Sequence, residues 1–259
     1  MRCQFVGVGE AFDDGLPNCA VHVEAFCQGG RRTALLDCGF TAPFAYWRLV
    51  ADPLDLDLLW ISHCHGDHFF GVPALLLRFW EEGRVKPLVV AGQPGVGHIV
   101  TQAMDLAYPN LRPRFAYPIE FVEIAPGDTV GVAGFTLACA LSDHPCANAS
   151  LRLTDGLSTL FYSGDGRPTP ATQTLAQGAD LVIHESFSLE EDTPGHGTVP
   201  GSIAFARAAG APLLALVHLR RDVRRDRGDA VRGLMRQASE AGDLSVLLPE
   251  PGDLLELKP

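Results

Sequence analysis

The sequence predicts a mixed α/β (α+β) fold in which β-sheets are covered by helices. Short apolar segments bounded by turn residues recur from the amino terminus, and helical patterns alternate with them later in the chain. The 259 residues are 47% hydrophobic, which is enough to bury a large core. Because no internal repeat or low-complexity linker divides the chain, we expect one domain over residues 1–259.

The expected strands are short runs rich in β-branched and aromatic residues, several of them placed to pair as hairpins. Asp155-Gly156 separates two such runs and is typical of a hairpin turn, because glycine readily adopts the positive φ that a tight turn needs. The expected strands span residues 3–8, 20–26, 33–36, 58–61, 88–91, 119–124, 135–141, 151–154, 159–162, 181–184, 213–218 and 244–248. Between some of them lie helical patterns, at residues 72–81, 95–108, 170–177, 201–209 and 229–241.

The charge balance argues against a long nucleic acid as partner. The formal net charge is −11, so the surface field repels polyanions unless a local basic patch overcomes it. Positive charge concentrates only in residues 220–227, where Asp222 and Asp226 interleave with arginines. This run therefore fits a solvated helix start as well as a binding surface.

The cysteines and the amino terminus indicate a soluble, cytoplasmic protein. Seven cysteines, an odd number without any C-x-x-C pair, do not form the pattern of a disulfide framework. The first residues enter a strand pattern without the apolar region of a signal peptide. Every apolar run is shorter than about 18 residues, so we expect no membrane contact.

The segment from His63 to His68 has the composition of a catalytic metal site. Its pattern, H-x-H-x-D-H, places three imidazoles and a carboxylate between an apolar strand and a helix, and it has a low chance of arising at random. In an extended turn, residues two apart face the same way, so His63 and His65 can address one cation. Asp67 and His68 would turn toward a second site with the start of the helix. Imidazole and carboxylate are the ligands that Zn²⁺ accepts at catalytic centres.

Three further candidates follow the ends of expected strands, where folds display functional side chains. They are His144, Asp165 and His218, and Asp165 is flanked by glycines that allow the backbone to approach a metal.

In this order, the seven residues resemble the metallo-beta-lactamase superfamily over nearly the whole chain. The resemblance implies a four-layer αββα sandwich and two divalent metal ions, with zinc expected and manganese or iron as alternatives. It also implies that Asp165 bridges the two ions and that Asp67 can orient a shared hydroxide. One ion would be held by His63, His65 and His144, and the other by Asp67, His68 and His218.

Other segments are similar to the branch of ribonuclease Z and small-molecule phosphodiesterases. They are Phe5 to Phe12, Leu36 to Gly39, Ala179 to Ser186, and Gly195-His196-Gly197-Thr198, which looks like that branch's Gly-His-Ser-Thr loop. The resemblance implies that His196 faces the scissile phosphate as a catalytic residue and not as a ligand. Glu185 is its expected partner, because a neighbouring carboxylate keeps an imidazole protonated; a surface glutamate is the alternative.

Departures from ribonuclease Z favour a small substrate. Only a hairpin's length separates His144 from Asp165, where ribonuclease Z carries its tRNA-binding arm, and Gly197 replaces the loop serine. A bridging aspartate also disfavours antibiotic hydrolysis, because the class B beta-lactamases lack it. We expect a phosphodiesterase that uses a metal-bound hydroxide on a small phosphodiester, with cyclic nucleotides and cyclic sugar phosphates as candidate substrates.

Four alternatives remain at this point. They are a lactonase, a thioesterase, a tRNA 3′-end endonuclease and a non-catalytic regulatory protein that binds metal. Family analogy also suggests a homodimer. Among the other histidines, His22 is expected at an exposed strand position and His98 on a helix, neither with a chemical role. Cys64 is expected to be a small buried hydrophobe that points away from His63 and His65.

Overall fold

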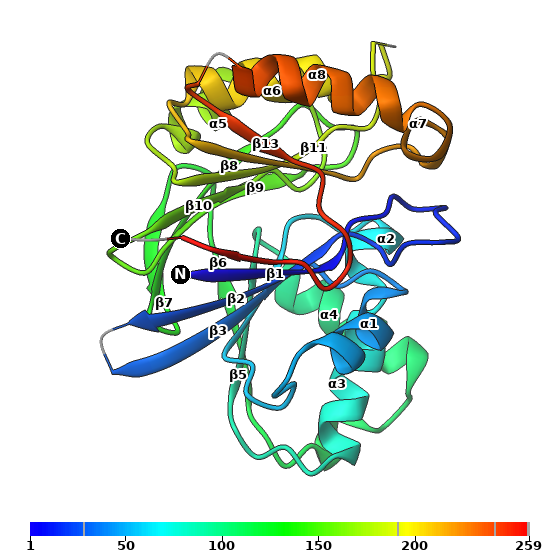
Figure 1. Cartoon of the computed structure of the whole chain (residues 1–259). Coiled ribbons are helices and arrows are strands. Elements are labelled where there is room, and N and C mark those ends of the chain that lie inside the picture. Colours follow the sequence, from blue (N-terminus) through cyan, green and yellow to red (C-terminus); the bar gives the residue numbers. More distant parts are fainter. Residues whose placement is uncertain (28, 191, 241, 258–259) are drawn as a thin grey trace.

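The computed structural model describes residues 1–27, 29–190, 192–240 and 242–257, and within them the strands form two seven-stranded sheets (Figure 1). The first sheet contains, from edge to edge, β14 (Leu254–Glu256), β1 (Arg2–Gly7), β2 (Ala20–Cys27), β3 (Gly30–Leu36), β4 (Leu58–Ile61), β5 (Leu88–Gly92) and β6 (Ile119–Glu123). The second contains β13 (Ser245–Leu247), β12 (Leu213–Val217), β11 (Leu181–Glu185), β10 (Thr159–Tyr162), β9 (Ala149–Thr154), β8 (Phe135–Leu141) and β7 (Thr129–Val132).

Helices cover the outer face of each sheet, which gives the expected αββα order of layers (Figure 1). The first sheet carries α1 (Ala42–Leu49), α3 (Val72–Glu81) and α4 (Val96–Ala107), with the short α2 (Gly66–Phe69) and the 3-10 turn η1 (Arg112–Arg114). The second carries α5 (Pro170–Ala176), α6 (Val199–Ala208), α7 (Arg221–Asp226) and α8 (Gly228–Glu240).

Three apolar clusters correspond to the three interfaces between these layers. The central cluster lies between the sheets and includes Phe5, Trp60, Leu151 and Tyr162. A second cluster packs the first sheet against its helices, and a third does the same for the second sheet. A strand that is buried on both faces is apolar at nearly every position, which explains the continuous apolar runs at residues 58–61 and 213–217.

The pairing of strands determines where loops collect. β3, β4, β5 and β6 are parallel in the first sheet, and β10, β11, β12 and β13 are parallel in the second. Parallel strands have their carboxyl ends at the same edge of a sheet, which is where open α/β folds place ligands. The remaining neighbours pair antiparallel, including β9 and β10 around the turn at Asp155-Gly156.

The expected elements are largely confirmed, and most of the differences lie in short elements. Sequence patterns missed β7, β14, α1, α2 and η1, of which β14 and η1 have only three residues each and α2 only four. The helix expected at 229–241 spans Gly228–Glu240, and residue 241 lies outside the described residues. The single-domain organisation remains a prediction.

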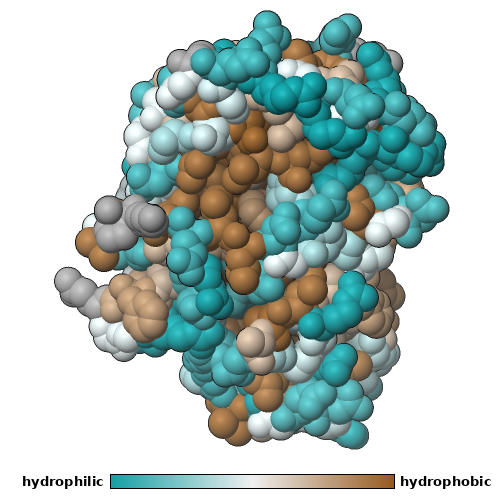
Figure 2. All heavy atoms as spheres, in the orientation of Figure 1, coloured by the Kyte–Doolittle hydropathy of each residue, from teal (hydrophilic) through white to brown (hydrophobic). Residues whose placement is uncertain are grey.

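Two features of the surface are its suitability for a membrane and the place where hydrophobic side chains gather on the face drawn in Figure 2. None of the helices in the described part of the chain is long and apolar enough to cross a membrane. Figure 2 shows hydrophobic atoms gathered on the side of the edge strands, with hydrophilic surface around α7. Both edge strands there, β13 and β14, have only three residues, and short edge strands offer little template for pairing with another chain.

Candidate metal centre

The predicted ligands meet at one edge of the sandwich, between the two sheets. His63, His65, Asp67 and His68 follow β4 of the first sheet, whereas His144, Asp165 and His218 follow β8, β10 and β12 of the second. His218 has a φ of 55°, in the left-handed region that non-glycine residues seldom adopt. Such strain persists only where the surrounding structure holds it, and here it turns the His218 ring toward the centre.

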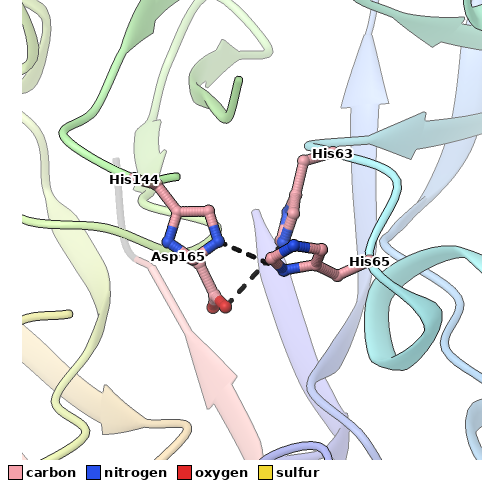
Figure 3. Close-up of side chains that lie close together, drawn as sticks. All are labelled: His63, His65, His144 and Asp165. Atoms are coloured by element: carbon pink, nitrogen blue, oxygen red, sulfur yellow. Dashed lines mark hydrogen bonds and ion pairs between the residues drawn. The ribbon is translucent and has the colours of Figure 1, made fainter. Parts of the chain in front are cut away.

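The first ligand group contains His63, His65, His144 and Asp165 (Figure 3). One ligand atom from each lies within 4.8 Å of all the others. Nε2 of His144 is 3.2 Å from Nδ1 of His65, and Nε2 of His63 is 3.8 Å from Oδ2 of Asp165. The side chains point into one space from both sheets, as Figure 3 shows.

The second group contains Asp67, His68, His218 and again Asp165, all buried. Nε2 of His218 lies 3.1 Å from Oδ2 of Asp67, and Nε2 of His68 lies 3.2 Å from Oδ1 of Asp165. Asp165 therefore presents one oxygen to each group, which is the arrangement a bridging ligand requires.

Outer contacts set the direction of three imidazoles. Nδ1 of His68 is 2.8 Å from the Asp37 carboxylate, Nδ1 of His144 is 2.8 Å from the carbonyl oxygen of Gly195, and Nδ1 of His63 is 3.0 Å from Oγ of Ser62. In His68 and His144, Nδ1–H donates to an oxygen, so the lone pair of a neutral ring lies on Nε2 and faces the centre.

Asp37 organises the region behind the second group, a role that was not predicted from the sequence. Its carboxylate is fully buried and accepts hydrogen bonds from the backbone N–H and hydroxyl of Ser62 and from the hydroxyl of Tyr162, as well as from His68. Like His218, it has a left-handed backbone conformation, with a φ of 60°. The available signal was an aspartate directly after the buried strand at residues 33–36.

The protein's own charges keep both carboxylates ionised. Burial alone would raise their pKa values, but His218 and His68 hold the pKa of Asp165 well below its usual range, and hydrogen bonds from the same two rings lower that of Asp67. Conversely, burial would lower the pKa of His218, yet Asp165 and Asp67 raise it to about 9. Burial and the neighbouring His68 lower the pKa of His63 to about 2.

The donor set fits divalent cations. Buried Nε2 atoms of His63 and His68 and the buried Oδ1 of Asp165 have no hydrogen-bond partner in the protein, although buried polar atoms are nearly always paired. All three atoms face the two ligand groups. Imidazole nitrogens and carboxylate oxygens around a shared aspartate suit zinc and similar ions.

His196 and Glu185 adjoin this centre. Nδ1 of His196 is 3.4 Å from Oε1 of Glu185, an ion-pair distance without the alignment of a hydrogen bond. The His196 ring stacks on Phe187 at a centroid distance of 4.6 Å and lies 5.1 Å from the ring of His144. The structure thus brings the predicted pair together beside the first ligand group.

Glu185 is not the surface residue considered as the alternative, because its side chain is fully buried. Its carboxylate accepts hydrogen bonds from the backbone N–H groups of Gly166, Gly197 and Phe187. It therefore holds together the loops that follow Asp165 and His196. Glu185, His196 and His218 also offer atoms within 4.8 Å of one another, so a third group of potential ligand atoms adjoins the first two.

One lesser expectation was wrong, and a second was right only in part. His22 is buried, not exposed, because α1 covers this face of the sheet and places Tyr46 6.0 Å from the His22 ring. Cys64 is only half-buried and lines a surface cavity. His98 lies exposed on α4, as expected.

The arginine-rich run is mostly neutralised within the chain. Arg221 pairs with Glu10, Arg224 with Glu250, and Arg225 with Asp226. These contacts match the reading of residues 220–227 as a solvated helix start, since α7 begins at Arg221.

Comparisons with known proteins agree with this geometry. The sequence model for the beta-lactamase superfamily domain matches residues 32–219. The chain is 26% identical to a ribonuclease BN of Erwinia tasmaniensis, covering 85% of this chain and 89% of that one.

Two solved structures share the fold. Human tRNase Z, short form, aligns with a TM-score of 0.79 at 20% identity and covers 100% of both chains. A diphosphatase of the PhnP family aligns with a TM-score of 0.71 at 14% identity, covering 99% of this chain and 98% of that one.

Proposed function

The chain belongs to the metallo-beta-lactamase superfamily and is a hydrolase of that fold, and from this premise we propose that it is a binuclear phosphodiesterase acting on small substrates. The observation that carries the proposal is the position of Asp165 between two complete ligand groups. Two cations suit phosphoryl transfer in particular, because together they stabilise the attacking and the leaving oxygen of an in-line displacement.

The residues would divide into three tasks. One ion would be held by His63, His65 and His144. The other ion would be held by Asp67, His68 and His218. Asp165 would bind both ions. When bound, two such ions supply Lewis acidity and lower the pKa of a water toward about 7. Asp67, at the edge of the second group, can accept a hydrogen bond from the attacking water and orient it.

His196 would stabilise charge or donate a proton at the leaving oxygen. Its ring is held by Phe187 on one face, and its Nδ1 faces the buried Glu185 carboxylate. The Nδ1 contact leaves Nε2 for the substrate. General acid catalysis of this kind contributes about 10²–10⁴ in rate.

Several features support a small substrate over tRNA. The segment between His144 and Asp165 forms only the β9–β10 hairpin, so the described residues include no arm at that position. The net charge is −11, and three arginines of the run at 220–227 pair with acidic residues of the same chain. Cyclic nucleotides and cyclic sugar phosphates fit these conditions.

A tRNA 3′-end endonuclease is the second candidate, because the similar protein of Erwinia tasmaniensis is named ribonuclease BN. A lactonase or thioesterase would use the same centre on a carbonyl. Zinc-loaded protein should be assayed against bis-p-nitrophenyl phosphate, 2′,3′- and 3′,5′-cyclic nucleotides, precursor tRNA, homoserine lactones and thioesters. Turnover of small phosphodiesters supports the proposal; turnover of lactones or thioesters with none of phosphodiesters overturns it, and preferred cleavage of precursor tRNA selects the endonuclease.

A further inference from the structure

Two of the seven cysteines differ from the others in access to solvent. Cys3, Cys19, Cys27, Cys38 and Cys139 are buried, whereas Cys64 and Cys146 are half-buried. These two line the same cavity, of about 190 Å³, whose other walls include Ile61, Val96 and Ile99. The proposed function assigns no task to either thiol.

The loops that carry the two thiols run side by side and contact each other at both ends. At one end, the Gln93 side chain donates to the carbonyl oxygens of Ser62 and Ala147, at 2.8 Å each, and Ala149 N–H donates to Ser62 O at 3.0 Å. At the other end, His65 and His144 are 3.2 Å apart.

These ties fix the register of the two segments. Ser62 lies opposite Ala147 and Ala149, and His65 lies opposite His144, so the segments run antiparallel. Cys64 is between Ser62 and His65, and Cys146 is between His144 and Ala147. The register therefore places Cys64 opposite the segment that holds Cys146, and both side chains reach the same cavity.

We propose that Cys64 and Cys146 form a second kind of metal site, a two-thiol site for a soft, thiophilic cation such as copper(I). Binding would replace the two thiol protons by two sulfur–metal bonds, and both protons would pass to solvent. Thiolates select soft cations, whereas the neighbouring imidazoles and carboxylates suit harder ones. Ile61, Val96 and Ile99 form apolar walls of this cavity. Two thiolates and one copper(I) ion together carry a single negative charge, so the cation offsets half of the charge that the two thiolates bring.

The site would be coupled to the His/Asp centre through shared residues. His63 lines the cavity, and Cys64 lies between the ligands His63 and His65 in the chain. A cation that draws Cys64 toward Cys146 therefore shifts two ligands of the first group. Occupancy of the thiol site would then reduce the affinity of that group for its own metal.

The first test uses copper(I) alone, supplied without oxygen to reduced, zinc-loaded protein in competition with the chelator bathocuproine disulfonate. The wild-type chain should retain one equivalent of copper(I) that Cys64→Ser and Cys146→Ser each lose. Cys27→Ala, at the end of β2, is the matched control and should behave as wild type. Equal copper retention by wild type and both serine variants, or retention by none of them, would overturn the proposal.

A second measurement tests the proximity of the thiols without any metal. Phenylarsine oxide condenses with two adjacent thiols to give one arsenic dithiolate and one water. Intact mass should show one adduct per wild-type chain, with Cys64 and Cys146 both protected from iodoacetamide, and no stable adduct in either serine variant. An adduct that persists in Cys64→Ser overturns the pair. Neither result depends on phosphodiesterase activity, so failure of the proposed function and failure of this inference are distinguishable.

Discussion

Nε2 of His218 and Oδ2 of Asp67 lie 3.1 Å apart, although 151 positions separate the two residues in the chain. Asp67 follows the first sheet and His218 the second, so their contact joins the two halves of the sandwich at one edge. Asp165 belongs to both ligand groups and so connects this contact to the first group. The centre is therefore assembled only when both sheets are packed, and its parts are not independent of one another.

Asp165→Asn should weaken both metal sites, because each ligand group uses an oxygen of this carboxylate. Loss of a residue that only hydrogen-bonds to a metal ligand typically lowers metal affinity roughly 10–100-fold. We expect a larger fall here, because Asp165 is itself a proposed ligand. Metal analysis and competition titration would measure this, with the exposed Asp229→Asn as the matched control. A fully loaded and fully active Asp165 variant would refute the bridging assignment.

Asp37→Asn should weaken the second site selectively. The amide keeps the size of the side chain but cannot accept from all four donors that surround the carboxylate, and the direction of the His68 ring is no longer fixed by charge. Loss of such an outer contact typically costs about 10–100-fold in metal affinity. Stepwise cobalt titration followed by absorption would separate the two sites; equal weakening of both would show a general structural effect instead.

The residues that meet in the candidate metal centre could be predicted from the sequence, whereas those that orient them could not. H-x-H-x-D-H is compact, and His144, Asp165 and His218 each follow an apolar strand in the order that the superfamily resemblance requires. Asp37 also follows an apolar strand, but its position alone does not show its role, which comes from contacts with Ser62, His68 and Tyr162 across the fold.

The misjudged residues share the same cause. Alternation along 20–26 predicted an exposed His22, but alternation reports burial only when one face of a sheet is open to water. In this sandwich, helices cover the outer face of each sheet, and His22 is buried beneath α1. Glu185 was expected beside His196, where the structure places it, but its full burial depends on loops that no local pattern specifies.

His22 should make the folded protein less stable at mildly acidic pH. Burial lowers the pKa of His22 to about 4, from 6.5 when unfolded. Between these values the unfolded chain binds a proton that the folded chain does not, so the free energy of unfolding falls as pH decreases from about 6.5 toward 4. Lowering the pH from 7.5 to 5 should therefore cost about 2 kcal/mol through this group alone.

The contribution of His22 to the pH dependence of the free energy of unfolding can be measured by urea denaturation. Wild type and His22→Leu would be compared at several pH values, with chelator present throughout. The metal centre titrates in both proteins, so it cancels in the difference between them. The wild type should lose about 2 kcal/mol more than the variant over this interval. Parallel curves would show that folding does not lower the pKa of His22.

The His196→Ala variant should keep both metals and lose activity by about 10²–10⁴-fold on substrates with poor leaving groups. The ring of His196 lies against Phe187 and near Glu185, where an imidazole can donate a proton to a departing alkoxide. p-Nitrophenolate departs without a proton, so p-nitrophenyl esters should be least affected. A slope of log kcat/KM against leaving-group pKa that is steeper in the variant than in wild type would establish proton donation. Equal losses across leaving groups would leave only charge stabilisation, and loss of metal would make His196 a ligand, as its proximity to Glu185 and His218 permits.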